Sequence, residues 1–304
     1  MIKRFKLSTS LILVFMVLVT LVGCEPKAAQ DTRPVAKGFI WEATSVDGNS
    51  VTLVGTMHPA PNTHILLNDK LKEILNSADI LTVEVDTTVA SSITKLQKSM
   101  NLEDGDTIEK YLSTDEINKL KKIINSNNQN INSIKKLNAY GLNQVILANQ
   151  LKETGFAGSS TDLLLMNQAK INKIEIDEIE GIDFQINLLN DIYSWNSLKE
   201  YINKYNDELK DKEIDRINKL FHNYVNSDVE NAEKLEAKLR EETDEEIYNL
   251  LNIERNKGMA NKIDELIKDG KKRVVAVGYR HYMGEDSVLD FLEEKGYTIK
   301  KIEI

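Results

Sequence analysis

Apolar and polar positions divide the chain into two α/β ends and a helical middle. Residues 38–45 and 50–56 are β-like runs separated by an Asp-Gly pair, a combination typical of a β-hairpin. Residues 68–77 place apolar side chains at helical spacing, and ILTVEVD at 80–86 predicts a buried strand. A strand, a helix and another strand in close succession favour a βαβ unit with parallel strands.

The C-terminal end returns to the same alternation. Residues 273–281 predict a strand, 285–296 predict a helix that ends at a glycine, and 297–304 predict a closing strand. The middle of the chain is helical and strongly charged, apart from a strand-like run at 172–180. We therefore predict an α/β fold with a central mixed, largely parallel sheet built from both chain ends, and a large helical insertion over about residues 91–269.

The first residues have the features of an export signal. A cationic start precedes an apolar run at 11–22, which is shorter than the ~20 residues of a membrane-spanning helix. The sequence LVGC that ends at Cys24 resembles a bacterial lipobox, in which a peptidase cuts before a cysteine that receives a diacylglyceryl group. The alternative is an uncleaved anchor with an incidental cysteine. We predict a signal peptide over 1–23, a lipidated tether over 24–35, one domain over 36–304, and attachment to the extracytoplasmic face of a bacterial cell membrane.

Composition narrows the chemistry that the chain can perform. The formal net charge of −9 argues against nucleic-acid binding, which needs a basic face for phosphates, and against a polybasic membrane patch. Cys24 is the only cysteine, so its acylation would leave no disulfide, no catalytic thiol and no thiolate ligand. Any metal site must therefore use His, Asp or Glu side chains, or water.

Two Gly-x-x-His motifs are the main candidates for a site. VTLVGTMH ends at His58 and VVAVGYRH ends at His281, and in each motif the glycine stands where an apolar β-like run stops. Ligands of parallel sheets bind beyond the carboxyl ends of the strands, so neighbouring strands would bring both imidazoles to one edge. Neutral imidazole ligates Mn²⁺, Co²⁺ or Zn²⁺ and also acts as a base. For each histidine taken alone, the alternative is a hydrogen-bonded loop residue.

The strand predicted at 80–86 adds two carboxylates. Glu84 and Asp86 are two residues apart, so in a strand they point to one face. A carboxylate near a strand end is costly unless it is solvated, paired or bound to a metal. The pattern leaves open whether Glu84 belongs to a site or faces water from an edge strand.

The motifs, taken in order, resemble the TraB/PrgY/GumN family, which includes the animal Tiki proteins. The resemblance covers nearly all of the chain after the tether. It is carried by FIWEATS and LVGTMH, by LNDKLKEILNSADILTVEVD, by DTIEKYLSTDEINKL, by IEGIDFQ with Glu180 and Gln185, by ERNKGMANKI with Arg255 and Asn256, and by VVAVGYRHYMGEDSVLDFLEEKGY. The ordered set is far more specific than any of its members.

The resemblance implies a fold similar to the erythromycin-esterase and ChaN group (EreA/ChaN-like) and a metal-dependent hydrolase activity. Animal members are described as metalloproteases that use Mn²⁺ or Co²⁺, and bacterial members are linked to shutting off peptide pheromones by cleavage or sequestration. Carried over residue by residue, it implies a divalent metal (Mn, Co or Zn) and a catalytic, metal-ligating core of His58, Glu84 and His281. Supporting roles are expected for Asp86, Glu180, Gln185, Arg255 and Asn256.

Several individual roles stay open at this point. Glu84 is expected to be a ligand or the general base. Arg255 is expected either to hold a substrate carboxylate or developing oxyanion, or to form a structural ion pair. Arg280 departs from the family pattern, because a small or apolar residue usually precedes the second histidine. Its positive charge would disfavour a nearby cation. The sequence assigns no role to His64 or His222.

These observations predict a lipid-anchored, metal-dependent hydrolase, a peptidase that acts on a peptide or protein substrate outside the cytoplasm. One alternative is a surface protein that captures a small peptide without cutting it. Another is haem binding at the same edge through His58 or His281 and a tyrosine such as Tyr279. The sequence does not determine the substrate, the metal or the oligomeric state.

Overall fold

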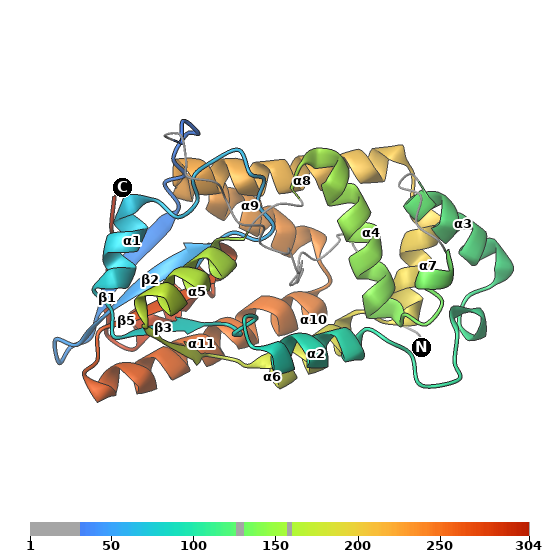
Figure 1. Ribbon diagram of the computed structural model, residues 1–304. Coiled ribbons are helices and arrows are strands. Elements are labelled where there is room, and N and C mark those ends of the chain that lie inside the picture. The colour runs from blue at the N-terminus through green and yellow to red at the C-terminus, as the bar shows by residue number, and fades with distance from the viewer. Residues whose placement is uncertain (1–30, 126–130, 157–159, 304) are drawn as a thin grey trace.

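The strands of the computed structural model, which describes residues 31–125, 131–156 and 160–303, form one six-stranded sheet (Figure 1). The strands are β1 (Phe39–Thr44), β2 (Ser50–Thr56), β3 (Ile80–Val83), β4 (Glu175–Glu178), β5 (Arg273–Gly278) and β6 (Thr298–Lys301), in the order β4-β3-β5-β2-β1-β6. β5 is parallel to both of its neighbours, β4 is parallel to β3, and β1 is antiparallel to β2 and β6. The prediction of a mixed, largely parallel sheet built from both chain ends is confirmed.

The first two strands form the predicted hairpin. Gly48 adopts a φ of 84° in the turn, and Ser45 N–H donates to the Asn49 carbonyl at 2.8 Å. Phe39 pairs with Gly55 across the two strands. The pairing places the end of β2, where the first Gly-x-x-His motif begins, beside the start of β1.

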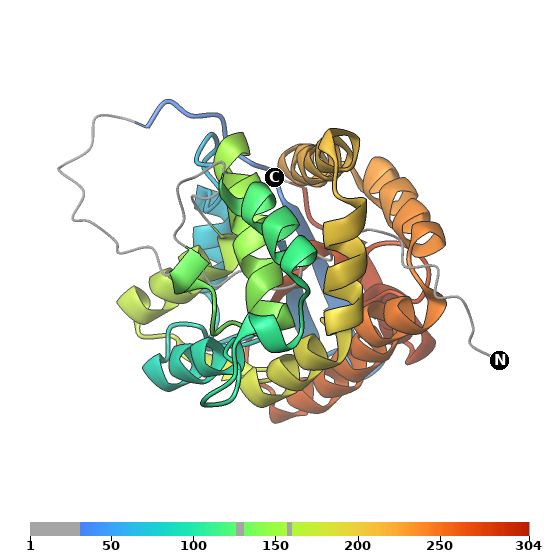
Figure 2. The same cartoon turned by 90° about the vertical axis from the view of Figure 1, so that its right-hand side faces the viewer.

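Helices cover the sheet and fill the middle of the chain. They are α1 (Asp69–Asn76), α2 (Ala90–Ser99), α3 (Thr114–Asn125), α4 (Ala139–Thr154), α5 (Thr161–Asn172), α6 (Ile182–Ile192), α7 (Trp195–Lys204), α8 (Asp207–Asn226), α9 (Val229–Glu242), α10 (Glu245–Tyr248), α11 (Glu254–Leu266) and α12 (Val288–Glu294), with a π-helical segment (Asn249–Ile253) between α10 and α11. Most of them belong to the predicted helical insertion, which is present. Figure 1 shows the sheet at one end of the molecule and α3, α4 and α7 at the other, with α8 along one side, and Figure 2 looks from the α3, α4 and α7 end toward the sheet.

The strand β5 shows how the sheet divides the core. Successive residues of a strand face opposite sides of its sheet. Val274 and Ala276 accordingly pack with apolar residues of α1 and α5. Val275 and Val277 belong to the larger core on the other face, which α8, α11 and α12 complete. Because both faces are covered, the middle of β5, Val274 to Val277, is wholly apolar, as expected for a central parallel strand.

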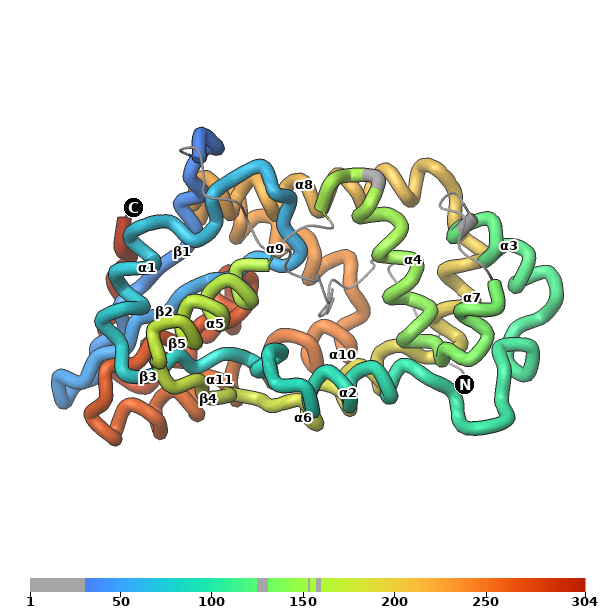
Figure 3. The backbone as a smooth tube through the Cα atoms, in the orientation of Figure 1, coloured from blue at the N-terminus to red at the C-terminus, as the bar shows by residue number. Residues whose placement is uncertain are grey.

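The carboxyl ends of the parallel strands face the helical insertion. β3 leads into α2 and β4 leads into α6, and both helices lie on the insertion side of the sheet, as the tube in Figure 3 shows. Side chains that directly follow β2, β3, β4 and β5 therefore lie between the sheet and the insertion. A parallel sheet offers its ligand site at this edge.

The strand predicted at 80–86 is shorter than its apolar pattern suggests. β3 ends at Val83, so Glu84 and Asp86 lie in the connection to α2, and the prediction that they share one face of a strand is wrong. The chain leaves the strand because the Asp86 carboxylate accepts the Thr88 N–H at 2.8 Å and holds a local turn.

The predicted export signal cannot be followed into the structure. The predicted signal peptide and the predicted lipidation site, Cys24, lie outside the described residues. The described residues begin within the predicted tether, where Val35 forms an isolated parallel bridge with Ile65. Among the described helices, none has the length and apolar character needed to cross a membrane.

Replacement of Gly55 by alanine is expected to destabilise the fold. A Cβ at this position would lie 2.6 Å from the Tyr279 Cβ and 3.2 Å from the Phe39 Cβ, so the end of β2 and the turn after β5 would have to separate. The expected loss is about 1–3 kcal/mol in the free energy of unfolding, measured by urea denaturation. The matched control is Gly258→Ala on α11, where a Cβ meets nothing within 4 Å and helix propensity should raise stability slightly. Equal unfolding free energies for the two variants would contradict the close approach of β2 to Tyr279.

Candidate active site

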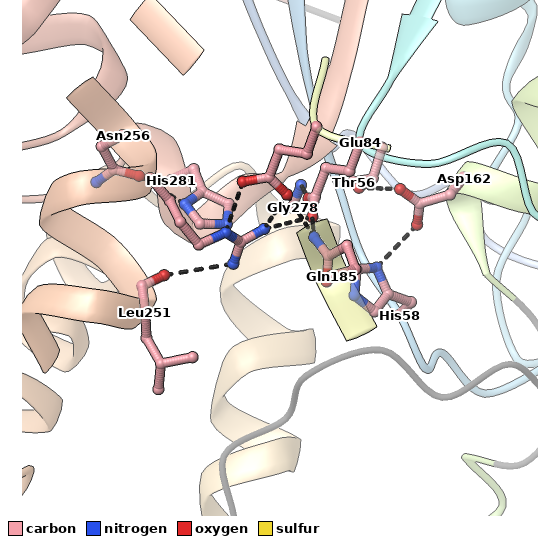
Figure 4. Close-up of polar contacts among 11 residues, drawn as sticks. Thr56, His58, Glu84, Asp162, Gln185, Leu251, Asn256, Gly278 and His281 are labelled. Carbon is pink, nitrogen blue, oxygen red and sulfur yellow. Dashed lines mark hydrogen bonds and ion pairs between the residues drawn. The ribbon is translucent and has the colours of Figure 1, made fainter. Parts of the chain in front are cut away.

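Both Gly-x-x-His motifs meet beside Gly278. β2 and β5 are parallel neighbours in the register Thr56↔Gly278, so the two motifs turn away from the sheet at the same edge. A methyl group placed on Gly278 would lie 3.4 Å from Glu84 Oε1, 3.7 Å from His281 Cδ2 and 3.8 Å from His58 Cε1. The three side chains predicted to form the core therefore surround one small space, here called the Gly278 cradle (Figure 4).

An aspartate that the sequence did not reveal holds the first histidine. His58 Nδ1 lies 2.9 Å from Asp162 Oδ2, and the Asp162 carboxylate also accepts hydrogen bonds from Thr56 Oγ1 at 2.6 Å and Ser160 Oγ at 3.1 Å. An ionised carboxylate only accepts, so His58 carries its proton on Nδ1 and a lone pair on Nε2 when it is neutral. Burial acts to lower the pKa of His58, but the Asp162 and Glu84 carboxylates together raise that pKa above its ordinary value.

The second histidine is held by an amide. His281 Nδ1 lies 2.6 Å from Asn256 Oδ1, and Asn256 Nδ2 donates to the Asp286 carbonyl at 2.8 Å. The second bond fixes which end of the amide faces the imidazole, so His281 also carries its proton on Nδ1 and a lone pair on Nε2. Burial and the positive charges of Arg255 and Arg280 hold the pKa of His281 well below its ordinary value, which keeps the ring neutral.

Glu84 is buried and fully hydrogen-bonded. Its Oε1 accepts the Gly278 N–H at 2.7 Å, and its Oε2 accepts from Arg255 Nη2 at 2.8 Å and from Gln185 Nε2 at 3.4 Å. Glu84 is only 4% exposed, so it does not face water from an edge strand. Burial raises the pKa of this carboxyl group above its ordinary value, although the Arg255 guanidinium opposes the shift.

Arg255 joins two buried carboxylates. Its Nε and Nη2 donate to Glu180 at 2.7 and 2.8 Å while Nη2 also reaches Glu84, and Nη1 donates to the Leu251 carbonyl at 3.3 Å. Gln185 closes the network with a hydrogen bond to Glu180. The guanidinium is thus committed within the protein, which favours the structural ion pair among the roles open for Arg255.

A local irregularity positions the residues of α11. The π-helical segment Asn249–Ile253 directly precedes this helix, and its Leu251 carbonyl accepts from Arg255 one turn later. Single π-helical turns inside α-helices occur frequently at functional sites. Nothing in the periodicity of the sequence indicated this segment, because apolar spacing does not distinguish a π turn from an α turn over five residues.

The remaining predicted residues lie apart from the cradle. The Asp86 carboxylate is used by its own turn at Thr88. His64 packs edge-on against Phe221 with ring centroids 5.3 Å apart, and His222 contacts Asn226 on the exposed side of α8. None of these contacts links Asp86, His64 or His222 to the two histidines of the cradle.

Arg280 is paired with a buried carboxylate, although its charge still contributes to the low pKa of His281. Its Nε and Nη2 donate to Glu236 at 2.7 and 2.9 Å, and Glu236 also accepts from Tyr248. The Glu236 carboxylate, 3% exposed on α9, neutralises the guanidinium. The departure from the family pattern thus comes with its own buried counter-charge.

Of the donors around the cradle, the two imidazoles suit a divalent cation best. Each imidazole has its Nδ1 fixed by an oxygen acceptor, the arrangement that metal-ligating histidines usually show. Glu84 is occupied by hydrogen bonds, and within the described part of the chain no three His, Cys, Asp or Glu side chains are grouped to hold an ion. An ion would therefore be held by His58 and His281, with water or substrate completing its coordination.

One protein-family model matches most of the chain. The model of the TraB/PrgY/gumN family matches residues 39–301, which include both strands, both histidines and the helical insertion. No curated protein and no solved structure matches the chain.

Replacement of Arg255 by methionine separates the two roles considered for this residue. If Arg255 is a structural ion pair, its loss leaves Glu84 and Glu180 as buried carboxylates without a counter-charge. The free energy of unfolding is then expected to fall by about 3–5 kcal/mol, measured by chemical denaturation at neutral pH. Arg33→Met is the control, because the Arg33 side chain is 38% exposed and its removal is expected to change stability by less than about 0.5 kcal/mol. A variant of Arg255 as stable as this control would instead support a substrate-binding role.

Proposed function

Since the chain belongs to the TraB/PrgY/gumN family, we propose that the Gly278 cradle is the active site of a metal-dependent hydrolase, a peptidase that acts on peptides or proteins outside the cytoplasm. The proposal includes attachment to the membrane through a lipid on Cys24. The observation that supports it best is the convergence of two imidazoles and one buried carboxylate within 3.8 Å of one point.

The cation would be Mn²⁺, Co²⁺ or Zn²⁺, and His58 and His281 would hold it. When bound, such an ion supplies Lewis-acid polarisation of a carbonyl and a lower pKa for a coordinated water. Asp162 fixes the tautomer of His58, and Asn256 fixes that of His281, so each ring has its lone pair on Nε2 when it is neutral.

Glu84 is the proposed general base. Its Oε1 is the carboxylate oxygen nearest the cradle and is held there by the Gly278 N–H. A raised pKa makes the carboxylate a better acceptor for the proton of an attacking water. Arg255 and Gln185 hold the other oxygen, so the group keeps its orientation while it accepts that proton.

The position of Tyr279 argues against the haem alternative, in which this tyrosine would be an iron ligand. Tyr279 is buried in the larger core, and its hydroxyl donates to the Leu220 carbonyl at 3.1 Å. Its oxygen is therefore engaged away from the two histidines. Capture of a peptide without cleavage remains the alternative that an experiment must separate from hydrolysis.

The test uses the full-length chain without a His-tag, in detergent. Metal content is measured by elemental analysis, and a pool of mixed-sequence octapeptides is followed by mass spectrometry with and without Mn²⁺, Co²⁺ or Zn²⁺. We expect bound metal and metal-stimulated cleavage in the wild type and loss of both in His58→Ala. Retention of intact peptides with no effect of metal would reject hydrolysis in favour of capture.

Gly278→Ala is expected to abolish activity while the fold persists. Its Cβ would keep ordinary distances of 3.4–3.8 Å to Glu84, His281 and His58, and Gly278 has an ordinary φ of −48°, so little strain arises. The methyl group fills the cradle, however, and cleavage should fall by at least about tenfold while the urea midpoint stays near that of the wild type. Full activity in this variant would show that the reacting groups do not meet in the cradle.

A further inference from the structure

One helix of the insertion carries a concentration of unpartnered buried polar atoms. In the described part of the chain, eight buried side-chain nitrogen or oxygen atoms have no hydrogen-bond partner, and four of them belong to α4. They are the Tyr140 hydroxyl, both ends of the Gln144 amide, and Gln150 Oε1. Burial of a polar group without a partner costs free energy, so each such group in a folded protein needs a physical account.

Two of these side chains have no hydrogen bond to any residue that the structure describes. Gln150 is engaged through its Nε2, which donates to Tyr201 and to Glu213 at 2.9 Å. The hydroxyl of Tyr140 and the amide of Gln144 are not engaged in this way, although the two residues are only 1% and 8% exposed. They are four positions apart, so they lie on one face of α4, one turn from each other.

The side chain of Tyr140 adjoins the buried network of the candidate site. It packs in one apolar cluster with Leu189 of α6 and with Leu251 of the π-helical segment. The Leu251 carbonyl accepts a hydrogen bond from Arg255, which is in turn bound to Glu84. Figures 1 and 2 show α4 on the sheet side of α3 and α7. Tyr140 is therefore connected to the Glu84 network through this cluster.

Gln185 carries a further unpartnered atom at the candidate site itself. Its Nε2 is bound to Glu84 and Glu180, so Oε1 is the end of the amide that faces away from both carboxylates. This oxygen has no partner among the described residues, although Gln185 is only 1% exposed. Leu189 lies one turn further along α6 and packs in the cluster of Tyr140. Unpartnered buried atoms thus occur at both ends of the contact path from Glu84 to α4.

The chemistry of α4 suits an uncharged partner that has both donors and acceptors. The helix has no charged side chain from Ala139 to Leu151, in a protein in which 29% of the residues are charged. A glutamine amide offers a carbonyl acceptor and N–H donors, and a tyrosine hydroxyl can donate or accept. A main-chain peptide group has one N–H, one carbonyl and no charge, so it matches these side chains.

We propose that Tyr140 and Gln144 bind peptide groups of the substrate main chain, so that α4 holds a peptide by its backbone. This inference rests on the proposed peptidase function and names the part of the substrate that α4 recognises. A bound peptide would supply the hydrogen-bond partners that the fold does not, and it would relieve the cost of burying these groups. The competing account is that buried water molecules alone partner them.

The test removes the unpartnered atoms and measures stability and peptide retention separately. Tyr140→Phe deletes one hydroxyl, and Gln144→Met replaces the amide by an apolar side chain of similar length. Neither variant breaks a hydrogen bond between described residues, so the urea midpoint without peptide should equal or exceed that of the wild type. Retention of mixed-sequence octapeptides by the full-length protein in detergent is measured by ultrafiltration and mass spectrometry. It should weaken about three- to tenfold in each variant.

Tyr201→Phe is the matched control, because it removes a buried hydroxyl that does have partners. The Tyr201 hydroxyl donates to Glu213 and accepts from Gln150, both at 2.9 Å. Its removal should lower the urea midpoint and leave peptide retention unchanged. The stability and the retention of Tyr201→Phe and Tyr140→Phe should therefore change in opposite ways.

A second peptide pool tests whether the main chain is the group that is bound. N-methylation of the peptide nitrogens removes the N–H donors and leaves the side chains unaltered. We expect the wild type to retain the N-methylated pool less strongly than the unmodified pool, and we expect this difference to shrink in Gln144→Met. A steric effect of the methyl groups alone would persist in the variant, and an undiminished difference would count against the inference.

The outcomes separate this inference from the proposed function. Wild-type retention in both α4 variants would show that buried water alone partners these atoms, and cleavage by the wild type would then leave the peptidase proposal intact. A lower urea midpoint in both variants would also overturn the inference, as would a wild type that retains no peptide. Weaker retention in the variants at an unchanged or higher midpoint, without cleavage of any peptide, would support the α4 site and count against hydrolysis.

Discussion

The parallel pairing of β2 with β5 is the constraint on which the site depends. Parallel strands can pair only across a long connection, and here the partner strand comes from the opposite end of the chain. The register Thr56↔Gly278 sets both Gly-x-x-His turns at the same height above the sheet. A shift by one residue would turn every side chain of β5 to the other face and move His281 away from His58. The side chains of β5 pack into different cores on the two faces of the sheet, and such a shift would exchange their packing partners.

Buried charge is the second determinant of the site, and the guanidinium of Arg255 is its centre. Arg255 lies between Glu84 and Glu180, so two carboxylates share one guanidinium inside the protein. When both carboxylates are ionised, this trio has an excess of negative charge, and Asp162 adds another carboxylate beside His58. A region of this charge would favour the cation proposed to lie between the histidines. The pairing of Arg280 with buried Glu236 is consistent with this requirement, because an uncompensated charge next to His281 would oppose the same cation.

The sequence indicated the features that follow from local pattern. Gly55 and Gly278 ended recognisable apolar runs, so the convergence of His58 and His281 followed from the rule for parallel sheets, and the hairpin followed from its Asp-Gly turn. Asp162 was missed because its contact with His58 crosses 104 positions and its local surroundings resemble an ordinary helix start capped by Ser160. The early end of β3 was missed because Val85 continues the apolar pattern after the strand hydrogen bonds have stopped.

The sheet edge and the helical insertion contribute different residues to the molecule. The sheet edge contributes both histidines and Glu84, and the two histidines depend on the parallel pairing of β2 with β5. The insertion contributes the face of α8 that contacts Tyr279, and on that face a charged residue has no local pattern to mark it as buried. A helix rich in Lys, Glu and Asp reads as a solvated surface, yet Glu213 and Arg216 are both withdrawn from water here. Burial on α8 is therefore set by the contacts of this helix with the sheet edge, at Tyr279 and at Lys37 and Gly38, and not by its local pattern.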